Sequence, residues 1–302
     1  MANTSDSGGF IFKTGLFALL AGIAYFFFNK SPQAAQDSGP IKPNTEIPIP
    51  IPEKPLPKTT KFTISEDLLP ISTTGEVVRH QWYVLSYSEA HEQAEWVVHE
   101  IQRERLNENW AARPNTFRPD FDVTTESATP RDYSSSGYDK GHLCPAADMA
   151  FDETAIDETF FMSNMSPQIP AFNGGIWREL EELSRDWGRK FKKIYVVTGP
   201  VLTRPGLGQI GQTKVTVPSQ FYKVLYAPEQ HRAIAFILPN AASNRPVMDY
   251  ACTIDQAEKT TGLDFFPKML NGLNEELEGS LDKSAWPIDR LRESRRVQEW
   301  NK

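Results

Sequence analysis

Cysteine, histidine and excess basic charge are all scarce in this 302-residue chain. It has two cysteines and five histidines, and its acidic residues outnumber its basic residues by 39 to 32. Two cysteines are too few for a disulfide framework, and Cys144 and Cys252 lack the spacing of a zinc finger, so we interpret both as free residues that line the core. The net charge of −7 gives no general attraction to polyanions. Nucleic-acid binding would therefore need a local basic groove.

Long hydrophobic runs are also scarce, with one exception near the N-terminus. Gly15–Phe28 contains no charged residue, and with its extension back to Phe10 it is longer than a signal-peptide core and at the lower limit for a membrane-spanning helix. No A-x-A cleavage site follows, and the flanking charges set the orientation only weakly. We predict that residues 1–30 are an uncleaved membrane anchor with the rest of the chain outside the cytoplasm, on the periplasmic side. Cleavage and secretion are the alternative.

Proline is concentrated in the segment that follows. Gly39–Lys58 contains seven prolines, which remove backbone donors and favour an extended polyproline conformation. We predict a semi-rigid linker over residues 31–60, a folded domain over 61–280 and a charged tail over 281–302 that forms a solvated helix. Residues 61–302 carry a net charge of −8, so the folded part is the acidic part.

The first part of the predicted domain combines a short strand with a helical pattern. Trp82–Leu85 is strand-like, and Ser86–Leu106 has apolar residues at helical spacing after a capping-box pattern. We therefore predict a helix there, with His91 and His99 exposed on it. The pattern His-Glu-x-x-His of zinc proteases requires a second histidine four residues after His91, and that position is Glu95, which excludes this chemistry.

The second half of the domain is richer in strand patterns. Three runs rich in β-branched and aromatic residues, 192–202, 213–227 and 232–240, are broken by Gly, Pro and Asn. A helix is predicted from about Gly174, with Trp177, Leu180 and Leu183 as its buried stripe. Because the strands and helices do not alternate regularly, we predict an α+β fold with a mostly antiparallel sheet flanked by helices.

Candidate chemistry begins at the stretch SGYDKGHLCPAADM. It places His142 after Asp139, Lys140 and Gly141, and a neutral imidazole is a good general base at physiological pH. A single histidine beside a glycine is more often structural. The chemical interpretation depends on the residues that follow it in the chain.

A second group of polar residues follows within about forty positions. Asn164 lies in FFMSNMSPQ, and Asn173, Glu181 and Arg185 have the spacing of one helix face. An amide oxygen suits a Mg²⁺ ion that keeps most of its waters, and a carboxylate two turns away can hold one of those waters. Each residue alone would be interpreted as a helix cap or an exposed ion pair. Together with a general base, they form a set that can cleave a phosphodiester.

These motifs resemble the DNA/RNA non-specific endonucleases of the ββα-metal (His-Me finger) class, whose signature is D-R-G-H followed by a metal-binding Asn on a helix. The resemblance runs from about Tyr83 to Phe266. It implies that His142 is the general base, that Asn173 is the direct ligand of Mg²⁺ (or Mn²⁺), and that Glu181 holds a metal-bound water. It also implies that Arg185 stabilises the transition state, that Asn164 supports the site, and that the products carry 5′ phosphates.

The sequence departs from that signature at one catalytic position. Lys140 replaces the usual Arg, which keeps the charge and loses the bidentate fork. The family also uses an upstream phosphate-binding Arg, for which Arg113 and Arg118 are both candidates. We expect a metal-dependent endonuclease in a bacterial, membrane-anchored form, acting on DNA and RNA, with a homodimer as one option. The alternatives are a catalytically weakened relative that binds nucleic acid or protein, and a small-nucleotide phosphodiesterase.

Overall fold

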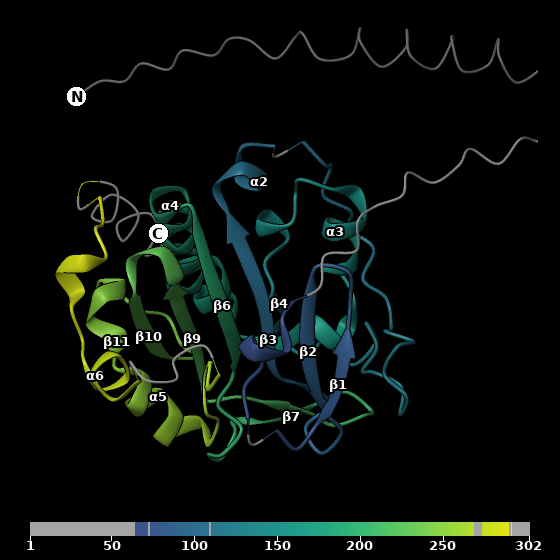
Figure 1. Cartoon of the computed structure of the whole chain (residues 1–302). Helices are drawn as coiled ribbons and strands as arrows, with labels where there is room; N and C mark the ends of the chain where they lie inside the picture. Colours follow the sequence, from purple (N-terminus) through teal and green to yellow (C-terminus); the bar gives the residue numbers. More distant parts are fainter. Residues whose placement is uncertain (1–63, 72, 109, 269–273, 290, 292–302) are drawn as a thin grey trace, which may run out of the picture. The chain divides into compact units, whose positions relative to one another are not determined.

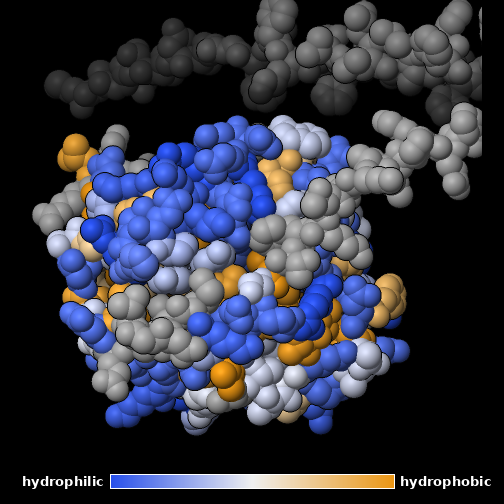
Figure 2. Space-filling view, in the orientation of Figure 1, coloured by the Kyte–Doolittle hydropathy of each residue, from blue (hydrophilic) through white to orange (hydrophobic). Residues whose placement is uncertain are grey.

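The computed structural model describes residues 64–71, 73–108, 110–268, 274–289 and 291. The predicted anchor, the linker and most of the predicted C-terminal helix lie outside these residues. Within the described part of the chain, no helix is both long enough and apolar enough to span a membrane. The view in Figure 2 shows a mostly hydrophilic surface on which hydrophobic residues form small separate groups.

A seven-stranded antiparallel sheet forms the centre of the fold (Figure 1). Its neighbouring strands are paired in the order β1-β2-β3-β6-β9-β10-β11. In that order the strands are β1 (Glu76–Arg79), β2 (Tyr83–Ser88), β3 (Gln93–Gln102), β6 (Lys193–Pro200), β9 (Gln220–Ala227), β10 (Arg232–Pro239) and β11 (Ala251–Cys252). The predicted α+β fold with a mostly antiparallel sheet is therefore confirmed.

Among the described residues, the α-helices are fewer than the strands. They are α2 (Arg103–Asn107), α3 (Glu153–Glu158), α4 (Arg178–Phe191), α5 (Ile254–Thr261) and α6 (Asn274–Gly279). Short 3-10 turns cover Glu66–Leu68, Ala146–Asp148, Met162–Asn164, Pro228–Gln230, Val247–Tyr250 and Lys283–Ala285. The helix predicted from about Gly174 corresponds to α4 and the turn before it, and its three predicted core residues are all buried.

Two apolar clusters cover the two faces of the sheet. In β3, Val97 belongs to the cluster that contains α4, and Val98 belongs to the cluster that contains α5. The same alternation occurs in β6 with Val196 and Val197, as expected for side chains that point to opposite faces of a strand. Both faces of the central strands are thus buried, so these strands have continuous rather than alternating apolar sequences.

The helix predicted over Ser86–Leu106 is wrong. This segment contains the end of β2, its turn and all of β3, and only its last residues form α2. The Ser86 hydroxyl does not cap a helix but donates to the Glu95 carboxylate at 2.7 Å. His99 is fully buried in β3 rather than exposed, and His91 is half-buried. Spacing favoured a helix because a strand buried on both faces has no period of two.

Two small hairpins complete the fold beside the main sheet. One pairs β4 (Asp139–His142) with β5 (Met165–Gln168), and the other pairs β7 (Gly208–Ile210) with β8 (Val215–Val217). A third apolar cluster, to which Tyr133, Met165 and Val215 belong, packs these hairpins together. Cys144 is buried, Cys252 is half-buried and both are free, as predicted.

Candidate active site

Four of the predicted site residues lie on a strand, a turn and a helix. His142 is the last residue of β4, which pairs with β5 so that His142 lies opposite Met165. Asn173 lies in a π-helical turn (Phe172–Trp177) that leads into α4. Glu181 and Arg185 follow one turn apart on α4 itself. One strand, one turn and one helix thus carry these four residues.

The His142 ring is held between aromatic side chains. Its centroid lies 5.0 Å from that of Phe160 and 5.8 Å from that of Phe117. Burial lowers the pKa of His142 to about 3, and the nearby charge of Arg113 contributes to the same effect. The imidazole is therefore neutral at pH 7. Its Nε2 is buried and has no hydrogen-bond partner among the described residues.

Gly141 is required by a close approach rather than by a turn. A Cβ at this position would overlap the side chain of Gln168, which lies across the β4–β5 pair. Both side-chain amide atoms of Gln168 are buried without partners in the described structure. A larger residue here would require the buried Gln168 side chain to move.

Asn173 is oriented by a carboxylate from β4. Its Nδ2 donates a hydrogen bond to Oδ2 of Asp139 at 2.9 Å. An amide has one donor end and one acceptor end, so this bond identifies Oδ1 as the free acceptor. An oxygen ligand with a fixed direction is what a hard divalent cation requires. The same bond ties the turn that carries Asn173 to the strand that carries His142.

Glu181 and Arg185 lie among buried charges. Burial raises the pKa of Glu181 to about 7, against the opposing charges of Lys223 and Arg185. Arg185 pairs with Asp148 at 2.9 Å, and Asp148 in turn bonds Nε2 of His99 at 3.0 Å. Burial acts to lower the pKa of Arg185, but Asp148 and Glu181 outweigh it and raise that pKa.

Asp148 and Lys223 are site residues that the sequence reasoning missed. Lys223 is fully buried in β9, where its ammonium donates to the Thr198 hydroxyl at 2.7 Å and lies 5.0 Å from the Trp177 ring. A lone charge inside the apolar run FYKVLY was a detectable signal, because a buried lysine needs a compensating environment. Asp148 lies in the same sequence stretch as His142. Its role could be recognised only from the structure, which shows that it bonds His99.

Asn164 fixes the backbone just after His142. Its Oδ1 accepts from the Cys144 N–H at 2.8 Å, and its Nδ2 donates to the carbonyls of Cys144 and Thr159 at 3.0 and 2.9 Å. All these atoms are buried, so the bonds keep the segment in one conformation. Burial also raises the pKa of the Cys144 thiol, which leaves it protonated.

The two upstream arginines differ in what they contact. Arg118 forms an ion pair with Asp157 at 2.6 Å and lies over the Phe161 ring. Arg113 is exposed, has no acidic partner among the described residues, and lies 5.1 Å from the Phe160 ring. Its charge acts on both His142 and Glu181. Lys140 extends over Phe117 at 5.2 Å from the ring. Arg113 and Lys140 are thus the free cations near His142.

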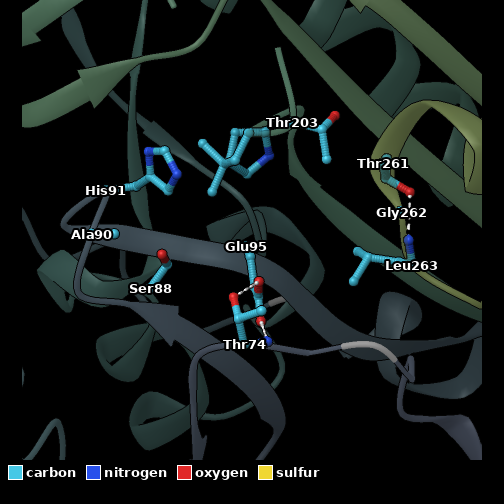
Figure 3. A pocket seen from close by; sticks show the side chains of 11 residues that line it. Thr74, Ser88, Ala90, His91, Glu95, Thr203, Thr261, Gly262 and Leu263 are labelled. Carbon is cyan, nitrogen blue, oxygen red and sulfur yellow. Dashed lines mark hydrogen bonds between the residues drawn. The ribbon is translucent and has the colours of Figure 1, made fainter. Parts of the chain in front are cut away.

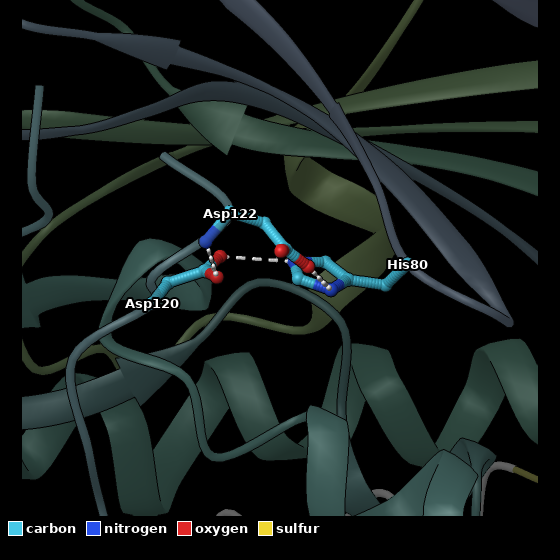
Figure 4. Close-up of side chains that lie close together, drawn as sticks. All are labelled: His80, Asp120 and Asp122. Atoms are coloured by element: carbon cyan, nitrogen blue, oxygen red, sulfur yellow. Dashed lines mark hydrogen bonds and ion pairs between the residues drawn. The ribbon is translucent and has the colours of Figure 1, made fainter. Parts of the chain in front are cut away.

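Two other polar features are occupied by structural bonds. His80, Asp120 and Asp122 lie close enough to hold a metal ion (Figure 4). However, Asp120 already bonds Nε2 of His80 at 2.9 Å and accepts bonds from Ser163 and the Asp122 N–H. A cavity of about 370 Å³ lined by His91, Glu95 and Thr261 is shown in Figure 3. The Glu95 oxygens there accept bonds from the 74–75 backbone and two hydroxyls.

The donor set near His142 suits a divalent metal ion better than the His80 cluster does. The free oxygen of Asn173 and the carboxylate of Glu181 are hard ligands, and Asp139 fixes the amide. The sequence of residues 62–271 matches the profile described as DNA/RNA non-specific endonuclease. The chain belongs to this family. As a member of this family, the protein is an endonuclease that hydrolyses phosphodiester bonds of DNA and RNA without strong sequence specificity. Nucleases of this family are metal-dependent.

Individual relatives of the endonuclease agree with this assignment. It is 36% identical to human mitochondrial endonuclease G over 203 residues, which cover 62% of this chain and 68% of that protein. It is 34% identical to nuclease C1 of Cunninghamella echinulata var. echinulata over 226 residues, which cover 68% and 89%. A crystal structure of an EndoG/EndoGI complex matches 64% of this chain and 86% of that chain, with a TM-score of 0.58 and 29% identity.

Proposed function

We propose that this endonuclease cleaves phosphodiesters with His142 as the general base and a Mg²⁺ ion held directly by Asn173. The observation that carries the proposal is the 2.9 Å bond between Asp139 and Asn173, because it aims the amide oxygen and joins it to the strand of His142. Asn173 would hold the ion, which when bound would supply Lewis-acid stabilisation of the phosphate and of the leaving 3′ oxygen. Mn²⁺ offers the same ligand preferences and is a proposed substitute.

His142 is suited to take a proton from the attacking water. Its ring is neutral at pH 7, so it can accept a proton, and Phe117 and Phe160 fix its orientation. A pKa of about 3 describes a weak base, but that value reflects burial and the charge of Arg113. A bound phosphate beside Arg113 offsets that charge and raises the pKa towards a value useful for proton transfer.

The remaining residues supply charge and positioning. We assign to Glu181 the holding of a water bound to the metal, and to Arg185, fixed by Asp148, the stabilisation of charge that develops on the phosphate. Asn164 supports the backbone after His142. Lys140 provides a point charge in place of a forked guanidinium. Between the two upstream arginines, the free Arg113 is the better phosphate contact.

The location of the enzyme is a separate proposal. The hydrophobic segment 15–28 and the proline-rich segment 39–58 support a bacterial, membrane-anchored enzyme whose domain lies on the periplasmic side, with secretion as the alternative. Fractionation of cells that produce the full chain distinguishes the two. Activity in the membrane fraction supports the anchor, and activity in the medium supports secretion. The homodimer stays a prediction.

The test of the proposed function is cleavage of supercoiled plasmid and of a structured RNA by the full chain, with Mg²⁺ and with EDTA. Degradation of both substrates only with the metal supports the proposal. Intact substrates in Mg²⁺ and in Mn²⁺ would instead favour a catalytically weakened binding protein. Cleavage of dinucleotide esters alone would favour the small-nucleotide phosphodiesterase.

A further inference from the structure

We propose that a polar cavity beside β4, between residues 129–136 and the β7–β8 hairpin, binds the sugar–phosphate strand that continues from the scissile phosphate, with Arg131 as its phosphate contact. The inference rests on the proposed function, because it assigns a further part of the substrate to the same site.

The lining of this cavity selects a polar ligand. Its volume is about 630 Å³, and Ile210 is the one large apolar residue among those that line it. Hydroxyl and amide side chains make up most of the remaining wall, with Arg131 as the cation. Apolar ligands gain little in such a cavity, whereas sugars and phosphates find many hydrogen-bond partners.

The two walls of the cavity are fixed to each other. The buried Asp132 accepts the N–H groups of Gln212 and Thr213 at 2.8 and 3.1 Å, and it also accepts bonds from Thr129. Gly211, at a φ of 70°, lies so close to Asp132 that a Cβ would overlap it. These hydrogen bonds hold the two walls at a fixed distance from each other, so the cavity is preformed.

Several side chains that line the cavity have no partner among the described residues. Those of Arg131, Ser135, Gln209 and Gln212 form no hydrogen bond or ion pair there, and all four residues are exposed. The exposed Arg131 guanidinium places positive charge at the cavity in a body whose net charge is −8. It provides the local basic contact that such a body needs in order to bind a polyanion.

A short series of contacts links this cavity to the catalytic histidine. The Tyr133 ring, between Asp132 and Ser134 in the chain, lies 5.8 Å from the ammonium of Lys140. The same ammonium lies 5.2 Å from Phe117, whose ring packs against His142. The Tyr133 ring is buried, so these contacts run behind the surface and place the segment 131–136 close to Lys140. The cavity therefore lies on the side of the site towards which a strand bound beside Lys140 can continue.

The test compares Arg131→Gln with Lys259→Gln in the full chain. Lys259 is an exposed lysine of α5 with no ion pair among the described residues, so both changes remove one free charge. For long DNA or RNA, Arg131→Gln is expected to raise KM roughly threefold to tenfold near physiological salt and leave kcat unchanged. The slope of log KM against log salt should fall by about 1. Cleavage of a dinucleotide should not change.

The contrary results are equally specific. If Arg131→Gln has the KM and salt slope of Lys259→Gln on long substrates, the cavity does not bind the strand. An equal loss on the dinucleotide would also overturn the inference, because the effect would then arise at the scissile phosphate. Absence of cleavage by the wild-type chain would contradict the proposed function itself, which separates the two failures.

Discussion

At the scale of single residues, the site depends on side chains that orient others. Asp139 does not need to touch the substrate, yet it decides which end of the Asn173 amide faces the metal position. Asn164 similarly acts on the backbone of Cys144 rather than on a reacting group. Such supporting contacts are often as important to a metal site as the ligands themselves.

Removal of Asp139 tests this orienting role. We expect Asp139→Ala to raise the Mg²⁺ concentration required for half-maximal cleavage by roughly 10- to 100-fold, because the amide loses its fixed direction. The matched control is Asp249→Ala, which removes an exposed carboxylate that pairs with Arg245 and is outside the catalytic set. Metal titrations of the cleavage rate give the values. An unchanged metal requirement in Asp139→Ala would show that Asn173 is not oriented by this bond.

The buried neutral histidine predicts a pH dependence of stability. The pKa of His142 is about 3 in the folded protein and near its ordinary value of 6.5 when unfolded. Between these values the unfolded chain binds more protons, so the free energy of unfolding falls as the pH is lowered from about 6.5 to 3. In His142→Ala this contribution is absent and the decline should be shallower. Urea unfolding at pH 7 and pH 5 measures it, and parallel declines would contradict the buried, neutral state.

At the scale of elements, the β4–β5 pair and α4 together form the site. Within the β4–β5 pair, Gly141 leaves room for the Gln168 side chain, which a Cβ at position 141 would overlap. A glycine close to a candidate base could be read from the sequence, but its structural partner lies in another strand and could not. The sequence therefore indicated the need for a small residue without its cause.

A pair of glycine substitutions tests this contact. Gly141→Ala is expected to lower the free energy of unfolding by about 1–3 kcal/mol, as overpacking in a tight core usually does. Gly174→Ala is the control, because a Cβ there meets no atom within 4 Å. Thermal or urea unfolding compares them. The double variant Gly141→Ala, Gln168→Ala should recover part of the loss, and a loss that persists fully would place the constraint elsewhere.

The elements that could be predicted from the sequence are those with an unambiguous signal. The buried stripe of α4 was recognisable from its helical period, and the strands β6, β9 and β10 from β-branched and aromatic runs broken by Gly, Pro and Asn. The segment that became β3 was not, since both of its faces are buried and its apolar residues also fit helical spacing. His99 was misplaced with it. As a result its bond to Asp148, and through Asp148 its link to Arg185, was out of reach of sequence reasoning.

At the scale of the whole molecule, a body of net charge −8 acts on polyanions. The composition argued mildly against such substrates. The structure resolves this, because Arg113 and Lys140, which lie close to His142, form no ion pair with any described acidic residue. Local charge near the site, and not the global field, thus determines binding.

Metal binding should also stabilise the whole domain. An ion that binds the folded but not the unfolded chain contributes about 1.4 kcal/mol at ten times its Kd. We expect Mg²⁺ without substrate to raise the Tm of the wild-type chain by a few degrees and to leave that of Asn173→Ala unchanged. Differential scanning calorimetry in Mg²⁺ and in EDTA measures both. An equal shift in the two proteins would place the ion at another site, such as the His80 cluster.

The most direct measurement of the central claim is the single-turnover rate of plasmid cleavage in Mg²⁺ by the wild type, His142→Ala and Asn173→Ala, each shown to be folded by circular dichroism. A general base contributes about 10²- to 10⁴-fold to the rate, so His142→Ala should lower the single-turnover rate by at least about 10²-fold. Asn173→Ala should lose most of its activity and recover part of it at high metal concentration. Wild-type rates in either folded variant would contradict the assignment of base and metal ligand.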